Sequence, residues 1–347
     1  MPKDTAIPSR LPLAGLRVIE MQAIGPVPFA GRVLARLGAT VTVVKPPVDA
    51  GLGVPLPAEF DLLAHGKSIV VIDLKSAAGH ERLMAELARS DVLLEGFRIG
   101  VLERLGLAPA SLLAHAPRLV IGRLSGWGTA GPYAARAGHD INYLALSGVL
   151  HAVGTRDDPA VPLNLIGDFG GGAMHLLVGV LALLVRRGID QQGGVVESSI
   201  LAGTLGLTPM FHGLLAAGQW IDTRAANLLD GGAPFYRCYA TACGGQVAVG
   251  ALEPKFYREL LGLLALDSVL QASQQYERAS WPETAQRFAA AFAGRSRDDW
   301  AAAAEHVDAC LAPVLSWAEA AAHPHNRANH WFADGEIGPQ RALDFPL

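Results

Sequence analysis

Short apolar runs alternate with longer helix-like segments along the first part of the chain, and this alternation constrains the fold more than any other feature. Strands are expected at 16–21, 41–44, 68–72, 91–94 and 119–124. Helices are expected at 29–37, which Gly38 ends, and at 78–90. Strands that alternate with such helices predict a mainly parallel sheet with crossover helices, so we expect an α/β protein.

The loop after the first strand argues against a nicotinamide cofactor. No Gly-x-Gly-x-x-Gly follows 16–21, where the chain has Gly25-Pro26. Glycines in that pattern let the pyrophosphate of a dinucleotide approach the backbone. We therefore do not expect a dinucleotide to bind here.

The second part of the chain has a different pattern. A helix with many small residues is expected over 198–219, and 223–233 has the Asn, Asp and Gly content of a connector. The segment 236–251 alternates around Gly244-Gly245 as a hairpin does. Helical patterns follow at 255–264, 281–293 and 297–306. These elements predict a smaller α+β domain.

Composition excludes several classes of protein. A chain of 347 residues with 51% hydrophobic and 17% charged residues is expected to fold as about two domains. Its 28 basic and 32 acidic residues leave no basic excess for nucleic acid. The three cysteines, Cys238, Cys243 and Cys310, lack metal-ligand spacing and fit a reducing compartment. We expect them to be packing residues, and we expect no metal site.

Nothing in the sequence predicts a membrane protein. The longest apolar stretch, 173–185, has thirteen residues and contains His175, whereas a membrane span needs about 20. It is expected to be a buried helix. Residues 1–10 lack the apolar core of a signal peptide. A cytoplasmic location without a membrane partner is expected.

Three residues stand where functional groups are often found. His139 follows Gly138, which allows close approach of a ligand, and precedes a helix-like run. Asp168 lies directly before the apolar helix, where a carboxylate is also explained as an N-terminal cap. Glu253 lies at the end of an apolar strand. Taken singly, each has a structural explanation beside the functional one.

A series of motifs is spaced along nearly the whole chain. They lie at 73–75, 95–98, 103–107, 138–148, 162–165, 167–172, 229–236 and 249–257. In this order they resemble the class III CoA-transferase (CaiB/BaiF) superfamily, in particular its α-methylacyl-CoA racemase branch. The resemblance implies a racemase that inverts the carbon next to a CoA thioester. It needs no separate cofactor, since coenzyme A is part of the substrate.

The resemblance also implies which residues act. A 1,1-proton transfer needs one group that removes the α-proton and another that returns a proton to the opposite face of the enolate. The matching positions are His139, as base for the (S)-thioester, and Asp168, as base for the (R)-thioester. Glu253 matches a residue that hydrogen-bonds the histidine, and Asn164 matches one that holds the aspartate. We further expect the glycine-rich helix start after Asp168 to donate N–H groups to the enolate oxygen.

Contacts with coenzyme A follow from the same resemblance. They are expected at Ile72, Asp73, Leu74, Lys75, Gly96, Phe97, Arg98 and Arg104, and at the backbone of Gly138, His139, Asp140, Ile141, Asn142 and Tyr143. Each basic residue among them is also explained as a solvated surface charge. The family's basic residue near the second strand has no direct match beside Val43-Val44-Lys45-Pro46. That phosphate contact has either moved to Lys45 or been lost.

The implied architecture is an interlocked homodimer. Each chain has a Rossmann-like large domain over 1–197 with a C-terminal return at 320–347, a linker over 198–230 and a small α+β domain over 231–319. Glu253 would then reach His139 from the partner chain.

Two alternative functions remain open: a class III CoA-transferase, in which Asp168 attacks the thioester to form an acyl anhydride, and a non-catalytic CoA-binding protein. His139 together with Glu253 and Asn164 favours the racemase. The acyl group stays undefined.

Overall fold

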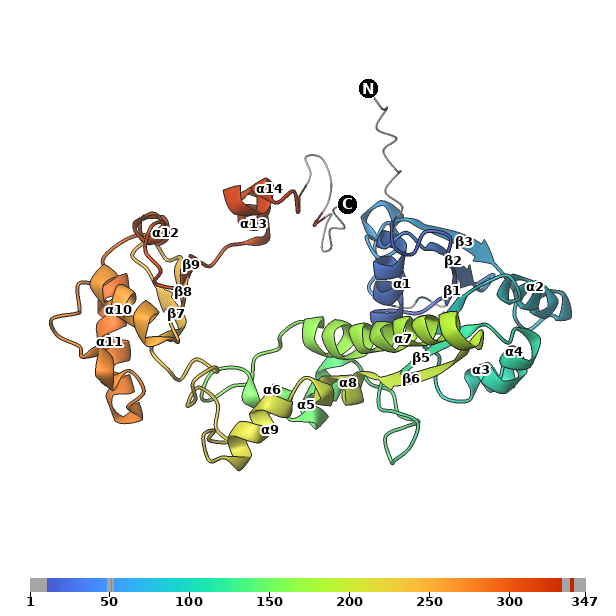
Figure 1. The fold of residues 1–347 in the computed structure, drawn as a ribbon, viewed down its shortest axis with the longest axis horizontal. Helices are drawn as coiled ribbons and strands as arrows, with labels where there is room; N and C mark the ends of the chain where they lie inside the picture. Colours follow the sequence, from blue (N-terminus) through green and yellow to red (C-terminus); the bar gives the residue numbers. More distant parts are fainter. Residues whose placement is uncertain (1–10, 49–50, 52, 333–337, 340–347) are drawn as a thin grey trace, which may run out of the picture. The chain divides into compact units, whose positions relative to one another are not determined.

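The computed structural model describes residues 11–48, 51, 53–332 and 338–339, which form two compact units. The first unit contains the described residues up to Val149 together with Pro162–Pro209. The second contains Leu150–Val161 and the described residues from Met210 onward (Figure 1). Residues 1–10, on which the expected absence of a signal peptide rests, lie outside the described part of the chain.

A six-stranded parallel sheet forms the centre of the first unit, as predicted. Its strands are β1 (Arg17–Met21), β2 (Thr40–Lys45), β3 (Lys67–Val71), β4 (Val92–Glu95), β5 (Val120–Ser125) and β6 (Gly194–Ser199). Their order is β3-β2-β1-β4-β5-β6, which reverses between β1 and β4 as in a Rossmann fold. The edge strand β6 has no predicted counterpart, because its side chains include Glu197 and two serines and none before Ser199 is fully buried.

Helices cover both faces of this sheet (Figure 1). They are α1 (Pro26–Arg36), α2 (Ala77–Leu87), α3 (Val101–Arg104), α4 (Pro109–His115), α5 (Asp140–Ser147), η2 (Leu165–Ala173), α7 (Met174–Asp190) and α8 (Ile200–Gly206). The short helix η1 (Ala58–Phe60) has no buried residue. Neighbouring residues of β1 point to opposite faces. Val18 packs in one core with Leu34 of α1 and Leu176 of α7, whereas Ile19 packs in another core with Leu83 of α2.

Two short helices mark the points where the chain passes between the units. They are α6 (Val149–Ala152) and α9 (Pro209–Ala216). The helix predicted over 198–219 is divided, because α8 ends at Gly206 and α9 begins at Pro209. Proline lacks the N–H that would continue a helix and disfavours helical backbone in the residue before it. Pro209 therefore accounts for the break.

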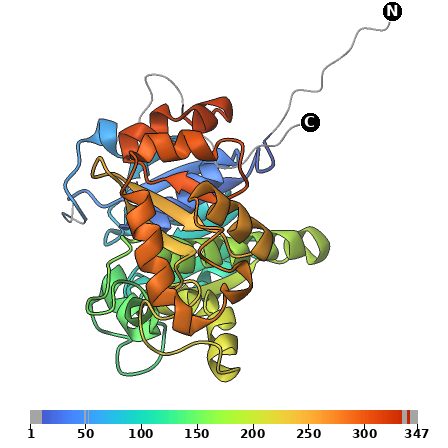
Figure 2. The same cartoon turned by 90° about the vertical axis from the view of Figure 1, so that its left-hand side faces the viewer.

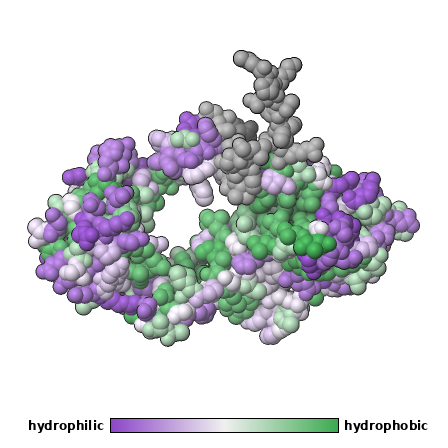
Figure 3. Space-filling model, viewed as in Figure 1, coloured by the Kyte–Doolittle hydropathy of each residue, from purple (hydrophilic) through white to green (hydrophobic). Residues whose placement is uncertain are grey.

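One long apolar helix differs from its prediction. The π-helix η2 continues into α7, giving a helix over Leu165–Asp190 of 26 residues. By length and composition alone it qualifies as a membrane span, a test that core helices of soluble proteins also pass. The prediction of a buried helix is wrong, because only the face of α7 that meets β5 and β6 is buried. The opposite face exposes Val178, Val185 and Ile189 by 65%, 71% and 84%. Figure 3 shows hydrophobic surface over the first unit.

The second unit contains the predicted antiparallel hairpin. Its elements are β7 (Tyr236–Ala240), β8 (Gln246–Gly250), α10 (Pro254–Leu263), η3 (Ala272–Gln274), η4 (Arg278–Ser280), α11 (Trp281–Phe292), α12 (Arg297–Ala304), β9 (Leu311–Pro313), α13 (Trp317–Ala322) and α14 (Pro324–Ala328). The sheet order is β7-β8-β9, and α11 packs against β7 (Figure 2). Phe235, Phe288 and Phe292 are fully buried in the core between sheet and helices.

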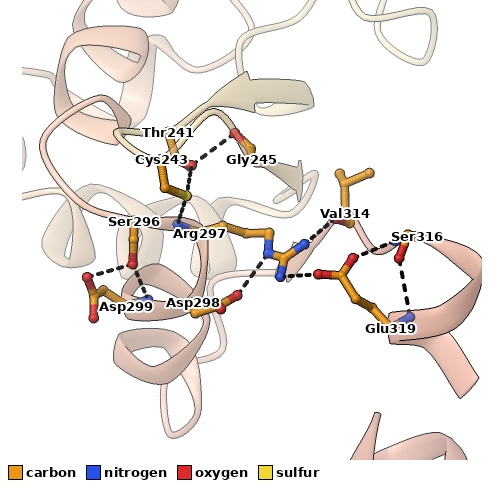
Figure 4. A network of polar contacts seen from close by, with 10 residues as sticks. All are labelled: Thr241, Cys243, Gly245, Ser296, Arg297, Asp298, Asp299, Val314, Ser316 and Glu319. Atoms are coloured by element: carbon orange, nitrogen blue, oxygen red, sulfur yellow. Dashed lines mark hydrogen bonds and ion pairs between the residues drawn. The ribbon is translucent and has the colours of Figure 1, made fainter. Parts of the chain in front are cut away.

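A network around Arg297 joins α13 to the rest of the second unit (Figure 4). The guanidinium of Arg297 bonds Asp298 at 2.8 Å, the carbonyl of Val314 at 3.2 Å and Glu319 at 2.7 Å. The carboxylate of Glu319 also accepts from the N–H of Ser316 at 2.8 Å. Residues 320–332, which the sequence assigned to a return into the large domain, therefore group with the second unit. Residues 333–337 and 340–347 of that predicted return lie outside the described residues.

The three cysteines are exposed, so their prediction as packing residues is wrong. Cys238 lies on the exposed side of β7, and Cys243 lies in the hairpin turn. The Cys243 sulfur accepts a hydrogen bond from the N–H of Arg297 at 3.4 Å (Figure 4). The core of the small sheet is filled by aromatic residues instead.

Part of the predicted linker is held by specific hydrogen bonds. Asn227 is fully buried, and its N–H donates to the carboxylate of Asp230 at 2.8 Å. The guanidinium of Arg224 donates to three backbone carbonyls, those of His151, Thr155 and Asp157. These bonds explain why the short segment Leu150–Val161 belongs to the second unit.

Candidate active site

Two glycine-containing loops meet where the strand order reverses, at the carboxyl ends of β1 and β4. Gly96 follows β4, and a Cβ at this position would lie only 2.9 Å from Cγ2 of Val27 in α1. Gly25 precedes α1 with a φ of +67°, and a Cβ there would lie 3.0 Å from Oδ2 of Asp168. Ligands of open parallel sheets bind at such a reversal. The fold therefore places Asp168 beside the position where a ligand is expected.

Asp168 is held inside the π-helix η2 and does not cap it. The residue that precedes η2 is Asn164, and the N–H of Phe169 donates to the Asn164 carbonyl at 3.3 Å, five residues earlier. This is the spacing of a π-helix, a rare form often found at functional sites. The N–H of Asp168 donates instead to Oδ1 of Asp140, at 2.7 Å. The explanation of Asp168 as an N-terminal cap is therefore wrong.

The environment of Asp168 favours the protonated carboxyl group. Burial, and then the nearby charge of Asp140, raise its pKa from 3.8 to about 6. A 3.4 Å hydrogen bond from the amide of Asn164, together with the charge of His139, acts in the opposite direction. Asn164 thus contacts Asp168, as the resemblance implied. A carboxyl group with this pKa can both give and take a proton near neutral pH.

His139 lies at the start of α5 with its side chain exposed. It is the residue that precedes this helix, and its backbone N–H donates to Oδ1 of Asn142 at 3.0 Å. The N–H of Asp168 donates to Oδ1 of Asp140, the residue that directly follows His139, and the charge of His139 lowers the pKa of Asp168. The first unit therefore brings His139 and Asp168 near each other, although 28 residues separate them in the sequence.

Glu253 belongs to the second unit. It precedes α10, and its side chain is exposed. Burial, and then the charge of Glu253, raise the pKa of the Cys310 thiol. Glu253 therefore belongs to a different unit from His139 and Asp168, and its predicted bond to the histidine stays a prediction.

Two of the basic residues expected to bind coenzyme A, Lys75 and Arg104, line one open pocket, whereas Arg98 does not. Leu74, Lys75 and Arg104 line a pocket of about 380 Å³ at the start of α2. Ser76 caps this helix by accepting from the N–H of Gly79 at 3.0 Å. His80 also lines the pocket. His80 could not be predicted from the sequence, because a histidine on an amphipathic helix has the same pattern as any other surface residue.

The neighbouring loop after β4 is fixed by Glu95. The buried Glu95 carboxylate accepts from the N–H of Phe97 at 2.8 Å and from Nε of Arg123 at 2.7 Å. Arg123 also bonds Glu103 and Glu197. These bonds order the predicted contacts Gly96, Phe97 and Arg98 without using their own side chains.

Two predicted contacts before that pocket have different environments. The Ile72 side chain is 2% exposed and belongs to a core, so only its backbone can meet a ligand. The carboxylate of Asp73 accepts from the N–H of Lys75 at 3.0 Å and so shapes the turn that presents the lysine. Lys45, the possible substitute for a lost phosphate contact, is the last residue of β2, at the same carboxyl edge.

Contacts of Tyr143 hold the start of α5. The hydroxyl of Tyr143 donates to the carbonyl of Gly138 at 2.6 Å, and Trp127 packs edge-on against Tyr143 at 4.6 Å between ring centroids. Ile141 is exposed. The first N–H groups of a helix have no partner within it, so those of Asp140 and Ile141 suit an anionic or carbonyl oxygen.

The glycines after Asp168 have a packing role. A Cβ at Gly171 would lie 2.6 Å from the backbone nitrogen of Thr204, and one at Gly203 would lie 1.9 Å from the carbonyl oxygen of Gly171. These glycines therefore allow η2 and α8 to approach closely. Their expected role toward an enolate oxygen stays a prediction. Over the described ranges, no group of three or more His, Cys, Asp or Glu is arranged to hold a metal ion.

Comparison with known proteins identifies the family of the chain. A model of CoA-transferase family III matches residues 13–346. The chain belongs to CoA-transferase family III. Mouse α-methylacyl-CoA racemase is 43% identical to this family III chain over 94% of it and 84% of the mouse protein. The human α-methylacyl-CoA racemase is 40% identical over 93% and 83% of the two chains.

Other family III members are more distant. A succinyl-CoA–D-citramalate CoA-transferase from Chloroflexus aurantiacus is 33% identical over 69% of this chain and 61% of its own. A solved CaiB/BaiF family protein from Brucella suis is 23% identical, covers 97% and 93% of the two chains and superposes with a TM-score of 0.78. That similarity confirms the family III fold: an α/β unit with a parallel sheet and a smaller α+β unit.

Proposed function

We propose that this family III protein is an α-methylacyl-CoA racemase, which interconverts (R)- and (S)-2-methylacyl-CoA thioesters. The observation that carries the proposal is the pairing of His139 with Asp168 beside the reversal of the strand order. The 43% identity with the mouse racemase over nearly the whole chain supports it. The residues themselves supply the two proton-transfer groups that such a reaction needs.

The proposed mechanism moves one proton at each face of the substrate. His139 takes the α-proton of the (S)-thioester, and the electron pair of the C–H bond moves into the enolate. Protonated Asp168 then gives its proton to the opposite face, which forms the (R)-thioester. In the reverse direction Asp168 is the base and His139 the acid. Each turnover leaves the pair with one proton, so no other reactant is consumed.

Coenzyme A transfer is the second candidate, because relatives in the family carry that name. In that reaction an ionised Asp168 attacks the thioester carbon and expels the CoA thiolate, leaving a mixed anhydride. The histidine near Asp168 favours proton transfer, because attack by a carboxylate needs no second acid–base group beside it.

Coenzyme A is proposed to bind along the carboxyl edge of the sheet. Lys75 and Arg104 line the same pocket, where their positive charges suit phosphate groups. His80 lines it as well and adds a ring nitrogen. The start of α5 is proposed to meet the thioester end through its backbone. Neither a metal nor a second cofactor enters this proposal.

We also propose that the active form is a homodimer. The exposed apolar face of α7 supports this, because Val178, Val185 and Ile189 lie in one row of a helix that is otherwise packed against its own sheet. Burial of such a face against a second copy is favourable. In this dimer, Glu253 of the partner subunit would bond His139 and support its protonated form.

Proton NMR tests the proposed reaction. A single enantiomer of a 2-methylacyl-CoA is incubated with the protein in D₂O, and the α-proton signal and the 2-methyl doublet are followed. We expect the α-proton to be lost and the doublet to collapse while the thioester stays intact.

The opposite result identifies the other reaction. If the α-proton persists, and CoA moves only when a carboxylate acceptor is added, then Asp168 is a nucleophile and the racemase proposal is wrong. Binding of the thioester with neither change would indicate a non-catalytic CoA-binding protein.

A further inference from the structure

Asp140 has a buried carboxylate with one oxygen that makes no hydrogen bond within the part of the chain that the structure describes. It is the first residue of α5 and only 8% exposed. Its Oδ1 accepts the N–H of Asp168 at 2.7 Å, whereas its Oδ2 is buried with no hydrogen-bond partner among the described residues. A buried carboxylate oxygen without a partner costs stability. A role of this carboxylate in the active site would offset its cost in stability.

We propose that Asp140 is a positioning residue for proton transfer: its carboxylate ties the helix start that carries His139 to the π-helix that carries Asp168, and holds a negative charge beside Asp168. The inference rests on the proposed racemase function and adds a residue to it. It is distinct from the contact with coenzyme A expected at the backbone of Asp140, because it concerns the side chain.

The backbone around Asp140 is shaped for this contact. A Cβ at Gly167 would lie 2.3 Å from Oδ1 of Asp140, so a side chain there would displace the carboxylate. Gly167 is itself buried. Because Asp140 directly follows His139 and bonds the backbone of Asp168, one rigid contact fixes how far apart the two proton-transfer groups lie.

The charge of Asp140 acts on the proton held by Asp168. After burial, it is the group that raises the pKa of Asp168. The groups that face Asp168 from the packed elements are His139 and Asn164, which lower that pKa, and Tyr143, whose own pKa is raised by burial and by Asp168. From α1 the nearest position is Gly25, which carries no charge, and α8 contains no titratable residue. Among the described groups that face Asp168, Asp140 is thus the only one that carries a negative charge like that of ionised Asp168.

The charge of Asp140 must affect the pH profile of kcat/KM equally in both directions of the reaction. The forward reaction uses neutral His139 with protonated Asp168, and the reverse uses protonated His139 with ionised Asp168. These two forms hold the same number of protons, so their ratio does not change with pH. Loss of the charge at position 140 therefore moves the acid side of the kcat/KM profile by the same amount for both enantiomers.

The test is the Asp140→Asn variant, which keeps an oxygen acceptor for the N–H of Asp168 and removes the charge. We expect the acid limb of kcat/KM to move to lower pH by about one unit for both enantiomers, with CoA affinity unchanged. Asp140→Ala, which also removes the acceptor, should lower kcat at least tenfold with little change in KM. Glu86→Gln removes a surface carboxylate of the same unit and should leave the profile in place.

A folded Asp140→Asn variant with an unmoved acid limb would overturn the inference. If that variant does not fold, ¹³C NMR of wild-type protein labelled at the aspartate carboxyl carbons decides, with Asp168→Asn to assign the signals. We expect Asp140 to be ionised at pH 7 while Asp168 titrates near pH 6. A neutral Asp140 throughout pH 5–8 contradicts it. This titration needs no turnover, so it separates failure of this inference from failure of the racemase proposal.

Discussion

At the scale of single residues, His139 and Asp168 should each be indispensable for inversion. Replacement of either by alanine is expected to lower racemisation on the order of 10²-fold or more. Glu253→Gln should cost less, because this residue only orients the histidine. The Asp168→Ala variant should still exchange the α-proton of the (S)-thioester without inverting it, because His139 remains. NMR in D₂O with chiral analysis measures both rates, and near wild-type inversion by Asp168→Ala would end the two-base mechanism.

The same aspartate should make the folded protein less stable at neutral pH. Asp168 loses its proton near pH 3.8 in the unfolded chain and near pH 6 in the folded protein. Between these values the folded state binds more protons, so the free energy of unfolding falls as pH rises. Asp168→Asn should therefore be more stable than wild type at pH 7.5 by about 1 to 3 kcal/mol, and the difference should disappear by about pH 4. Urea unfolding at both pH values measures this.

A surface carboxylate provides the control for that measurement. Asp267→Asn changes an exposed aspartate of the second unit and should give no such dependence on pH. If Asp168→Asn raises the free energy of unfolding by the same amount at both pH values, the effect does not come from the ionised carboxylate.

At the scale of elements, α1 packs on the sheet over a buried ion pair. Nζ of Lys67, at the start of β3, lies 2.6 Å from Oε2 of Glu20 in β1 and also donates to the carbonyl of Pro28 at 2.8 Å. The side chains are 1% and 2% exposed. Burial raises the pKa of Glu20 and lowers that of Lys67. A Cβ at Gly31 would lie 1.7 Å from Oε2 of Glu20, so α1 can pack over the pair only with glycine there.

Removal of one partner of this ion pair should lower the free energy of unfolding strongly. Lys67→Met leaves Glu20 buried without its partner, and we expect a loss of about 3 to 5 kcal/mol in the free energy of unfolding. The double variant with Glu20→Leu should recover much of this loss. Arg287→Ala, which breaks an exposed pair with Glu283, should cost less than about 1 kcal/mol. Urea unfolding of wild type, the two single variants Lys67→Met and Glu20→Leu, the double variant and Arg287→Ala gives the comparison, and additive losses in the double variant would contradict it.

The elements also show where sequence reasoning succeeds. The strands β1 to β5 follow from mainly apolar runs. This is expected for the central strands β1 and β4, which are buried on both faces, whereas the edge strand β3 exposes Ile69 and Val71. The edge strand β6 escapes the same reasoning, because its Glu197 pairs with Arg123. The π-helix cannot be inferred from periodicity, since its start depends on a bond from Asp168 to the distant Asp140. The motifs identify His139, Asp168 and Asn164, but a side-chain role for Asp140 requires the fold.

At the scale of the whole molecule, activity should depend on subunit association. If Glu253 of the partner subunit supports His139, dilution until the dimer dissociates should abolish inversion. Val178→Asp on the exposed face of α7 should favour the monomer, because it would bury a charge in the dimer. Light scattering with the NMR assay measures mass and inversion together. Full activity in a verified monomer would contradict the dimer proposal.

The path of the chain between the two units has a consequence for its synthesis. Arg224 bonds the carbonyl of Thr155, which lies 69 residues earlier in the sequence. At roughly 5 to 20 residues per second, a ribosome needs about 3 to 14 seconds to cover that distance. The last strand of the large sheet, β6, is also made within this interval, and until its end Leu150–Val161 lacks its hydrogen bonds to Arg224. A nascent chain thus exposes this segment for seconds, which makes it a place where a chaperone or a protease can act before folding is complete.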